Sequence, residues 1–274
     1  MRISSVSLFG VLAIGVLSAC SVSTTANSIT FKTQQEFTDS SQPAKTSTAD
    51  WNGEAIKIVN DGVNPLTGAG GIEITVDPSA TKITASAVFA ARADDDAHKS
   101  DADQSIADAI QTFTISEDNG FTVECHHGQA HGTSGQASSG CKLLRVTIPQ
   151  GSDTKPVQLT VGNGIGDLKF VGSGVLTASK LDVQNTGVGD MDVKVQPTKG
   201  ATLSVTGSDD ITVRLPGDFA SDSVTIEGGM DETDIDTSAF SGMKSGSAFG
   251  TTGTGAASLN IKTSGVGKIV VTTF

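Results

Sequence analysis

Apolar and polar residues alternate along much of the chain, and this pattern predicts short β-strands. The alternation is clear in Ile56-Lys57-Ile58, in Ile72-Glu73-Ile74-Thr75-Val76 and in the stretch from Ala85 to Phe89. A period of two residues is typical of strands with one buried face, and the glycine, asparagine and proline residues between the runs mark turns. By the same pattern, further strands are expected at 114–116, 121–125 and 143–148.

One segment of the first half breaks the β pattern and predicts a helix. Ile106, Ile110 and Phe113 recur at helical spacing, and Ser100-Asp101-Ala102-Asp103 resembles a capping box. We expect a helix of about three turns, from Asp101 to Thr112.

The second half of the chain contains an internal repeat. Gly164-Ile165-Gly166-Asp167-Leu168 matches Gly187-Val188-Gly189-Asp190-Met191 at a spacing of 23 residues, and Gly265-Val266-Gly267-Lys268-Ile269 matches both. Weaker copies occur at 210–213 and 233–236. Each copy follows a leading strand, and these strands are expected at 157–161, 181–184, 202–206, 223–226 and 259–262. A unit of this kind cannot bury its apolar row alone, so the repeat predicts stacked rungs.

The fold class that we expect is mainly all-β: a parallel β-solenoid-like repeat domain, with one short helix in the first half of the chain. Each rung would stack on the one before it, with Leu168, Met191, Ile211 and Ile269 pointing inward. The expected organisation is a signal peptide at 1–19, a lipidated cysteine and Ser/Thr-rich tether at 20–50, an N-terminal β part with the helix and a disulfide hairpin at 51–156, and solenoid repeats at 157–274.

The N-terminus has the layout of a secretory signal. Arg2 precedes an apolar run at 6–17, which is too short for a permanent membrane span. Leu17-Ser18-Ala19-Cys20 resembles the lipobox of bacterial lipoproteins, which implies cleavage before Cys20, acylation of this cysteine and a membrane anchor. An ordinary secretory signal with a chance cysteine is the alternative. Ser21 stands where an aspartate usually marks inner-membrane retention, so the resemblance favours the outer membrane of the bacterial cell envelope.

Charge and cysteine content narrow the possible functions. With 18 Lys and Arg against 30 Asp and Glu, the net charge is −12, which opposes contacts with the phosphates of nucleic acids. Cys125 and Cys141 form an even pair in an exported chain, and oxidising compartments favour a disulfide between them. This disulfide would close a loop of fifteen intervening residues.

Two features of the sequence raise the question of metal binding. His126, His127 and His131 are imidazole candidates for Zn, Cu or Ni, although the Gly- and Ser-rich continuation to Gly140 favours a solvated loop. The Gly/Asp turns resemble calcium-binding nonapeptides, but here the apolar residue follows the aspartate directly. Lys268 also replaces the aspartate in the last copy. We therefore expect these turns to be structural.

Motifs of enzymes and of sugar-binding proteins are not found in the sequence. It has no Gly-x-Ser-x-Gly elbow, no complete phosphate-binding loop and no His-Glu-x-x-His, so we expect no enzyme. Trp51 is the one tryptophan and there is no tyrosine, which leaves few aromatic platforms for a carbohydrate.

From Trp51 to Phe274 the sequence resembles bacterial adhesin-like lipoproteins with the β-repeat of autotransporter adhesin heads. The motifs that carry this resemblance, besides the Gly-x-Gly-Asp repeats, are Ile56-Lys57-Ile58-Val59-Asn60, Gly71-Ile72-Glu73-Ile74 and Leu144-Arg145-Val146-Thr147-Ile148-Pro149. The resemblance implies a structural or adhesin-like role with a protein or surface partner, and it brings no catalytic residues. A periplasmic metal-binding lipoprotein that uses the histidine loop is the alternative.

Overall fold

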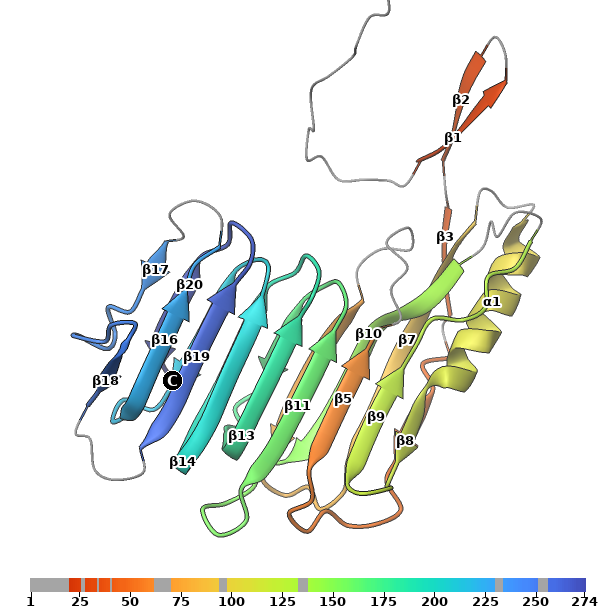
Figure 1. Ribbon diagram of the computed structural model, residues 1–274. Coiled ribbons are helices and arrows are strands. Elements are labelled where there is room, and N and C mark those ends of the chain that lie inside the picture. Colours follow the sequence, from red (N-terminus) through yellow and green to blue (C-terminus); the bar gives the residue numbers. More distant parts are fainter. Residues whose placement is uncertain are drawn as a thin grey trace, which may run out of the picture.

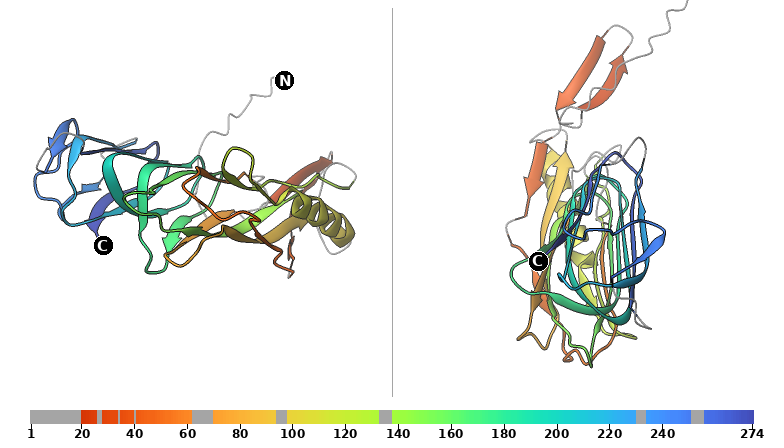
Figure 2. Two further views of the ribbon diagram at one scale, coloured as in Figure 1. Left: turned by 90° about the horizontal axis from the view of Figure 1, so that it is seen from below. Right: turned by 90° about the vertical axis from the view of Figure 1, so that its left-hand side faces the viewer.

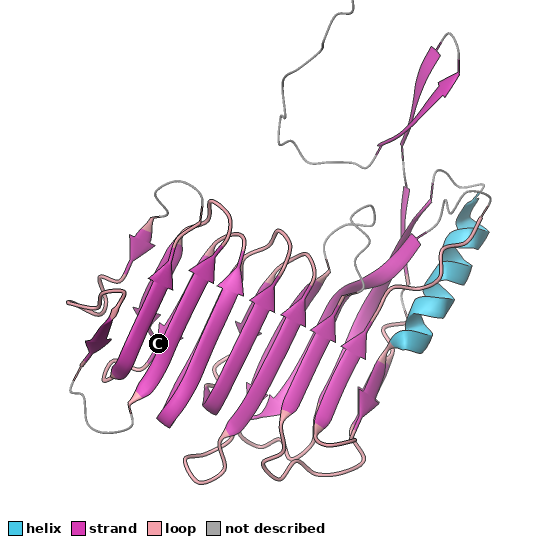
Figure 3. Ribbon diagram, viewed as in Figure 1, coloured by secondary structure: helices cyan, strands magenta, loops and turns pink. Residues whose placement is uncertain are grey.

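The computed structural model describes residues 20–25, 28–33, 35–39, 41–61, 70–93, 98–132, 138–229, 234–250 and 256–274. The signal peptide expected at 1–19 lies outside them. The described part is mainly β with one helix, α1 (Lys99–Thr112), as Figure 3 shows. One network of eighteen strands divides into two ladders, here called the front and back ladders after their positions in Figure 1. Seen end on in Figure 2, the two ladders form two layers.

The front ladder is parallel except at its two ends. In spatial order it contains β8 (Thr114–Ser116), β9 (Phe121–Cys125), β5 (Ile56–Asn60), β11 (Val157–Asn163), β13 (Leu176–Asn185), the second half of β14 (Met191–Gly207), β19 (Ala257–Thr263), β16 (Ser221–Glu227) and β18 (Ser247–Phe249). The terminal strands β8 and β18 are antiparallel to their neighbours.

The back ladder is also mostly parallel. In the repeats it consists of the strands that follow the glycine-containing turns. In spatial order it contains β3 (Gln35–Thr38) and β4 (Ala44–Thr46) beside β7 (Thr84–Ala93), then β10 (Ser138–Pro149), β6 (Gly71–Asp77), β12 (Leu168–Val171), the first half of β14, β15 (Ile211–Leu215), β20 (Ile269–Thr273) and β17 (Ile235–Asp236). From β10 to β17 all pairs are parallel, so equivalent residues of the repeats lie side by side.

The predicted inward row is confirmed. Leu168 pairs with Met191, Met191 with Ile211, and Ile211 with Ile269, and each of these side chains is at most 1% exposed. Alternate residues of the strands from both ladders fill one apolar core in this way. Burial of this core is the main stabilising contribution, because each rung alone would leave its apolar row in water.

The expected order of the rungs is wrong. We expected each rung to stack on the previous one, but β19 and β20 lie inside the stack, between β14 and β16 and between β15 and β17. The turns nest in the same order: a Cβ on Gly265 would lie 1.8 Å from the carbonyl oxygen of Ser208, and one on Gly229 would lie 1.9 Å from that of Gly265. Glycine at these positions lets adjacent turns approach this closely.

The two ladders also cross the expected boundary at residue 156. Strands β5, β6, β9 and β10 from the first half lie in the same ladders as the repeats, and β9 and β10 lie outside β5 and β6. The repeats and the first half therefore share one core. The repeat signal is lost there because longer connections, including α1, separate these strands in the sequence.

Helix α1 covers one end of the stack (Figure 1). The predicted helix is confirmed, but the capping box is wrong: His98 is the N-cap, it makes no side-chain capping hydrogen bond, and Ser100 lies within the helix. The helix buries Ala102, Ser105, Ile106 and Ala109, and such tertiary contacts stabilise a helix without a cap. At the other end of the stack three aromatic rings pack edge to face: Phe219, Phe240 and Phe249.

The segment expected to be a tether contains four strands. β1 (Cys20–Thr25) pairs with β2 (Ser28–Thr33) as a separate hairpin, whereas β3 and β4 pair with β7 and extend the back ladder. The folded domain thus begins at Gln35 and not at Trp51. Short polar strands give a weak pattern in the sequence, and pairing to β7 supplies the hydrogen bonds that order them.

Candidate binding groove

Charged side chains of alternating sign form a row across the outer face of the back ladder. Arg145 pairs in register with Glu73, Glu73 with Lys169, and Lys169 with Asp192. Arg145 Nε donates to Glu73 Oε2 at 2.9 Å, and Arg214 from β15 donates two hydrogen bonds to Asp192, at 2.8 and 2.9 Å. Opposite charges on adjacent strands stabilise the register of a sheet.

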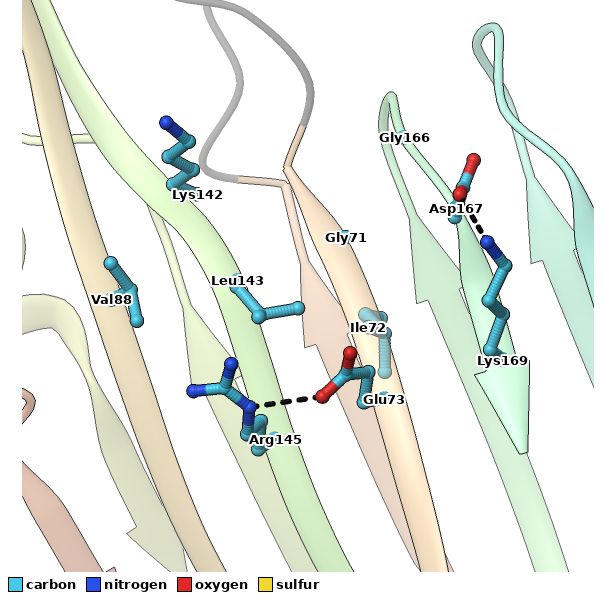
Figure 4. A pocket seen from close by; sticks show the side chains of 10 residues that line it. All are labelled: Gly71, Ile72, Glu73, Val88, Lys142, Leu143, Arg145, Gly166, Asp167 and Lys169. Atoms are coloured by element: carbon cyan, nitrogen blue, oxygen red, sulfur yellow. Dashed lines mark hydrogen bonds and ion pairs between the residues drawn. The ribbon is translucent and has the colours of Figure 1, made fainter. Parts of the chain in front are cut away.

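A groove of about 480 Å³ opens on this face at its upper edge (Figure 4). Gly71 and Gly166 contribute no side chains to it, which leaves the space open, and Val88 and Leu143 give it an apolar wall. Lys142, Arg145, Lys169, Glu73 and Asp167 add charges around this wall. The groove therefore combines a small apolar surface with ionic groups of both signs.

Asp167 and Lys169 of the groove hold each other in their ionised states. A hydrogen bond from Lys169 lowers the pKa of Asp167, and the same bond raises the pKa of Lys169. These groups are substantially exposed, so the pairs contribute little to stability. None of the described residues that line the groove carries a hydroxyl, thiol or imidazole group. Its chemistry is ion pairing, hydrogen bonding and apolar contact.

A second groove, of about 550 Å³, lies at the opposite edge of the ladders. It is lined by Trp51 together with Pro78, Pro149 and polar residues that include Lys155. The indole Nε1 of Trp51 donates to the carbonyl oxygen of Glu54 at 2.7 Å, so the ring is held in place.

The structure does not gather the three candidate metal ligands into one site. His126 contacts Asp61 at 2.5 Å and lies 3.7 Å from Glu124, whereas His131 contacts Asp108 of α1 at 2.6 Å. His127 is exposed. In the described part of the chain no group of three or more His, Cys, Asp or Glu side chains has an arrangement that could hold a metal ion. The loop is instead attached to the domain by separate imidazole–carboxylate contacts.

The structure brings Cys125 and Cys141 together, as the disulfide requires. Cys125 ends β9 in the front ladder and Cys141 lies in β10 of the back ladder; both are buried and in hydrogen-bond contact. The structure does not bond the two sulfur atoms. Burial, together with the contact to Cys141, raises the pKa of the Cys125 thiol. A disulfide here would join the two ladders beside α1, and it stays a prediction.

A column of buried asparagines was missed in the sequence. Asn60, Asn163 and Asn185 are in register at the ends of β5, β11 and β13, and each is at most 3% exposed. Their amide groups donate to backbone carbonyls nearby, and Asn185 donates to Gly166 of the preceding turn and Gly189 of the following turn, both at 3.0 Å. The signal was the asparagine that ends three of the strands, β5, β11 and β13. These side chains stabilise the turns between the ladders.

Comparison with known proteins does not assign a family to this chain. No protein-family model, curated protein or solved structure matches it. Within the described residues, no helix is long and apolar enough to cross a membrane. The groove and the edges of the ladders therefore have to be interpreted from their own chemistry.

Proposed function

We propose that the protein is a lipid-anchored protein of the bacterial cell envelope, acylated on Cys20, with a structural or adhesin-like role. In this proposal the ladders are the two faces of a parallel β-solenoid. The alternation of the chain between the ladders and the in-register asparagine column support the coil. The lipobox-like sequence at 17–20 supports the anchor.

The observation that carries the adhesin-like role is the groove on the outer face of the back ladder. It presents the apolar side chains of Val88 and Leu143 beside three cationic and two anionic side chains, on a rigid sheet. Such a surface suits an extended partner that offers both polar and apolar groups, such as a protein segment on a neighbouring surface.

Anchoring is tested by cell fractionation of the full-length protein and of Cys20→Ala. The native protein should partition into the detergent phase, and the variant should be released or remain as an uncleaved precursor. Detergent partitioning of Cys20→Ala equal to that of the native protein would disprove the anchor. Protease treatment of intact cells then determines whether the domain is displayed on the surface.

Adhesion is tested on cells that display equal amounts of native or variant protein. Leu143→Glu places a carboxylate on the apolar wall of the groove and should reduce attachment to protein-coated surfaces. Thr225→Glu is the matched control, because Thr225 lies on β16 of the front ladder, away from the groove. Equal attachment of both variants and the native protein would exclude the groove as the adhesive site.

A further inference from the structure

The turns that carry the Gly-x-Gly-Asp sequences form one edge of the molecule, here called the turn edge. It consists of the turns at 164–167, 186–190, 207–210 and 264–268, at the top of Figure 1. Backbone hydrogen bonds join successive turns, as from Gly166 N to Val188 O at 2.7 Å and from Ser264 N to Gly207 O at 2.9 Å. The edge is therefore a continuous, ordered surface.

Two turns of this edge carry exposed apolar side chains. Of the four large apolar side chains exposed in the described residues, two lie here: Val188 at 69% and Val266 at 79%. Val188 and Val266 occupy the tips of their turns, whereas Ile235 pairs with the inward residue Ile269 and is exposed at the end of the back ladder. The fourth, Phe274, follows β20 at the opposite edge. Exposed apolar residues at the tips of two turns of one ordered edge suit contact with a partner surface.

The chain reaches the domain at this same edge. Gln35 pairs with Ala93, the last residue of β7, and β7 ends at the turn edge because it runs antiparallel to β10. The β1–β2 hairpin then returns the chain, so that Cys20 pairs with Thr33, two positions before β3 begins. The residue proposed to carry the acyl chains is thus paired two positions before the strand that begins at the turn edge.

From these observations we propose that the turn edge docks onto the phospholipid headgroups of the membrane that holds the Cys20 acyl chains. This inference rests on the proposed lipid anchor. The axis of the ladders then lies along the membrane surface, with Val188 and Val266 inserted at headgroup level. The anchor favours this contact because it holds the edge at high local concentration near the lipid.

Carboxylates on the same edge limit the depth of insertion and select the lipid. Asp167, Asp190, Asp209 and Asp210 flank the apolar tips, and Asp209 lies in the turn between those of Val188 and Val266. Charged groups stay in the hydrated headgroup region, so the contact is shallow. Like charges repel, so a zwitterionic surface should bind this edge better than an anionic one.

The test measures tryptophan fluorescence. Trp51, the single tryptophan, lies at the opposite edge and serves as the control fluorophore. In a Trp51→Phe background, Val266→Trp places the indole at a turn tip far along the stack from Cys20. The lipidated full-length protein is reconstituted into phosphatidylcholine vesicles brominated close to the headgroup. Emission from the new indole should fall, because an indole at headgroup level lies close to the bromine atoms, and emission from Trp51 in the otherwise native protein should not change.

Two further measurements separate the possible failures. Adding Val188→Asp to the reporter protein should abolish the quenching, and vesicles with phosphatidylglycerol should weaken it. If the native protein does not float with vesicles, the lipid anchor is wrong. If it floats but the indole at position 266 is quenched no more than Trp51, or is quenched more on anionic vesicles, the docking of the turn edge is wrong.

Discussion

The position of the last two strands inside the stack can be tested with two matched substitutions. Ile269 in β20 and Ile235 in β17 are paired with each other and occupy equivalent positions of the repeat. Ile269 also pairs with Ile211 on its other side and is fully buried, whereas Ile235 is 43% exposed at the end of the back ladder. Stacking in sequence order would reverse these roles and place Ile235 between Ile211 and Ile269.

The structure predicts a large cost for Ile269→Ala and a small one for Ile235→Ala. Truncation of a fully buried isoleucine removes its transfer free energy and leaves a cavity, which together destabilise by about 2–5 kcal/mol. At Ile235 nearly half of the side chain is already in water, so we expect a loss of about 1 kcal/mol or less. For a domain of this size the first change lowers Tm by about 4–20 °C, at about 2–4 °C per kcal/mol.

The measurement is urea unfolding of the full-length variants, followed by far-UV circular dichroism and by the fluorescence of Trp51. An unchanged m value would show that the variants differ in stability and not in the extent of unfolding. If Ile269→Ala does not fold, Ile269→Val should still lose about 0.5–1.5 kcal/mol. An Ile235→Ala variant destabilised as much as the variant at Ile269 would refute the observed strand order.

Three further predictions concern the turns, the cysteines and the surface charge. Gly265→Ala should destabilise by about 1–3 kcal/mol in a thermal melt, because its methyl group would overlap a backbone oxygen, whereas Gly162→Ala meets open space and should be neutral or stabilising by up to about 1 kcal/mol. Mass analysis after alkylation of the exported protein should show Cys125 and Cys141 joined, with a stabilisation of about 3 kcal/mol, and two alkylated thiols would contradict this. Partial burial of Asp190 and the nearby carboxylates raise its pKa above the usual 3.8. The ionised form of Asp190 therefore destabilises the folded protein, and this destabilisation disappears as the pH falls below 3.8, where the carboxyl group is protonated in both the folded and the unfolded states. Asp190→Asn should therefore stabilise at pH 7 by up to about 0.5 kcal/mol, and a gain that persists at low pH would show that charge is not its cause.

The sequence by itself determined the local elements and the buried face of each strand. Alternation in segments such as Ile72 to Val76 placed strands correctly, because the side chains of a strand alternate between its two faces whatever its neighbours are. The helical spacing of Ile106 and Ile110 located α1 for a similar reason. The inward row through Leu168 followed from the repeat, since equivalent positions of stacked units share one environment.

Only the tertiary structure decided which strands are neighbours and which side chains meet. Parallel strands pair through backbone hydrogen bonds that every copy of the repeat can supply, so the sequence pattern allowed Ile269 to be at the end of the stack, although it lies inside. The groove needs Gly71, Leu143 and Gly166, which come from two strands and a turn that are distant in sequence. His131 illustrates the same limit, because its partner Asp108 lies on a helix and not in the histidine loop. Contacts of this kind depend on long-range packing, which a local pattern of residues does not encode.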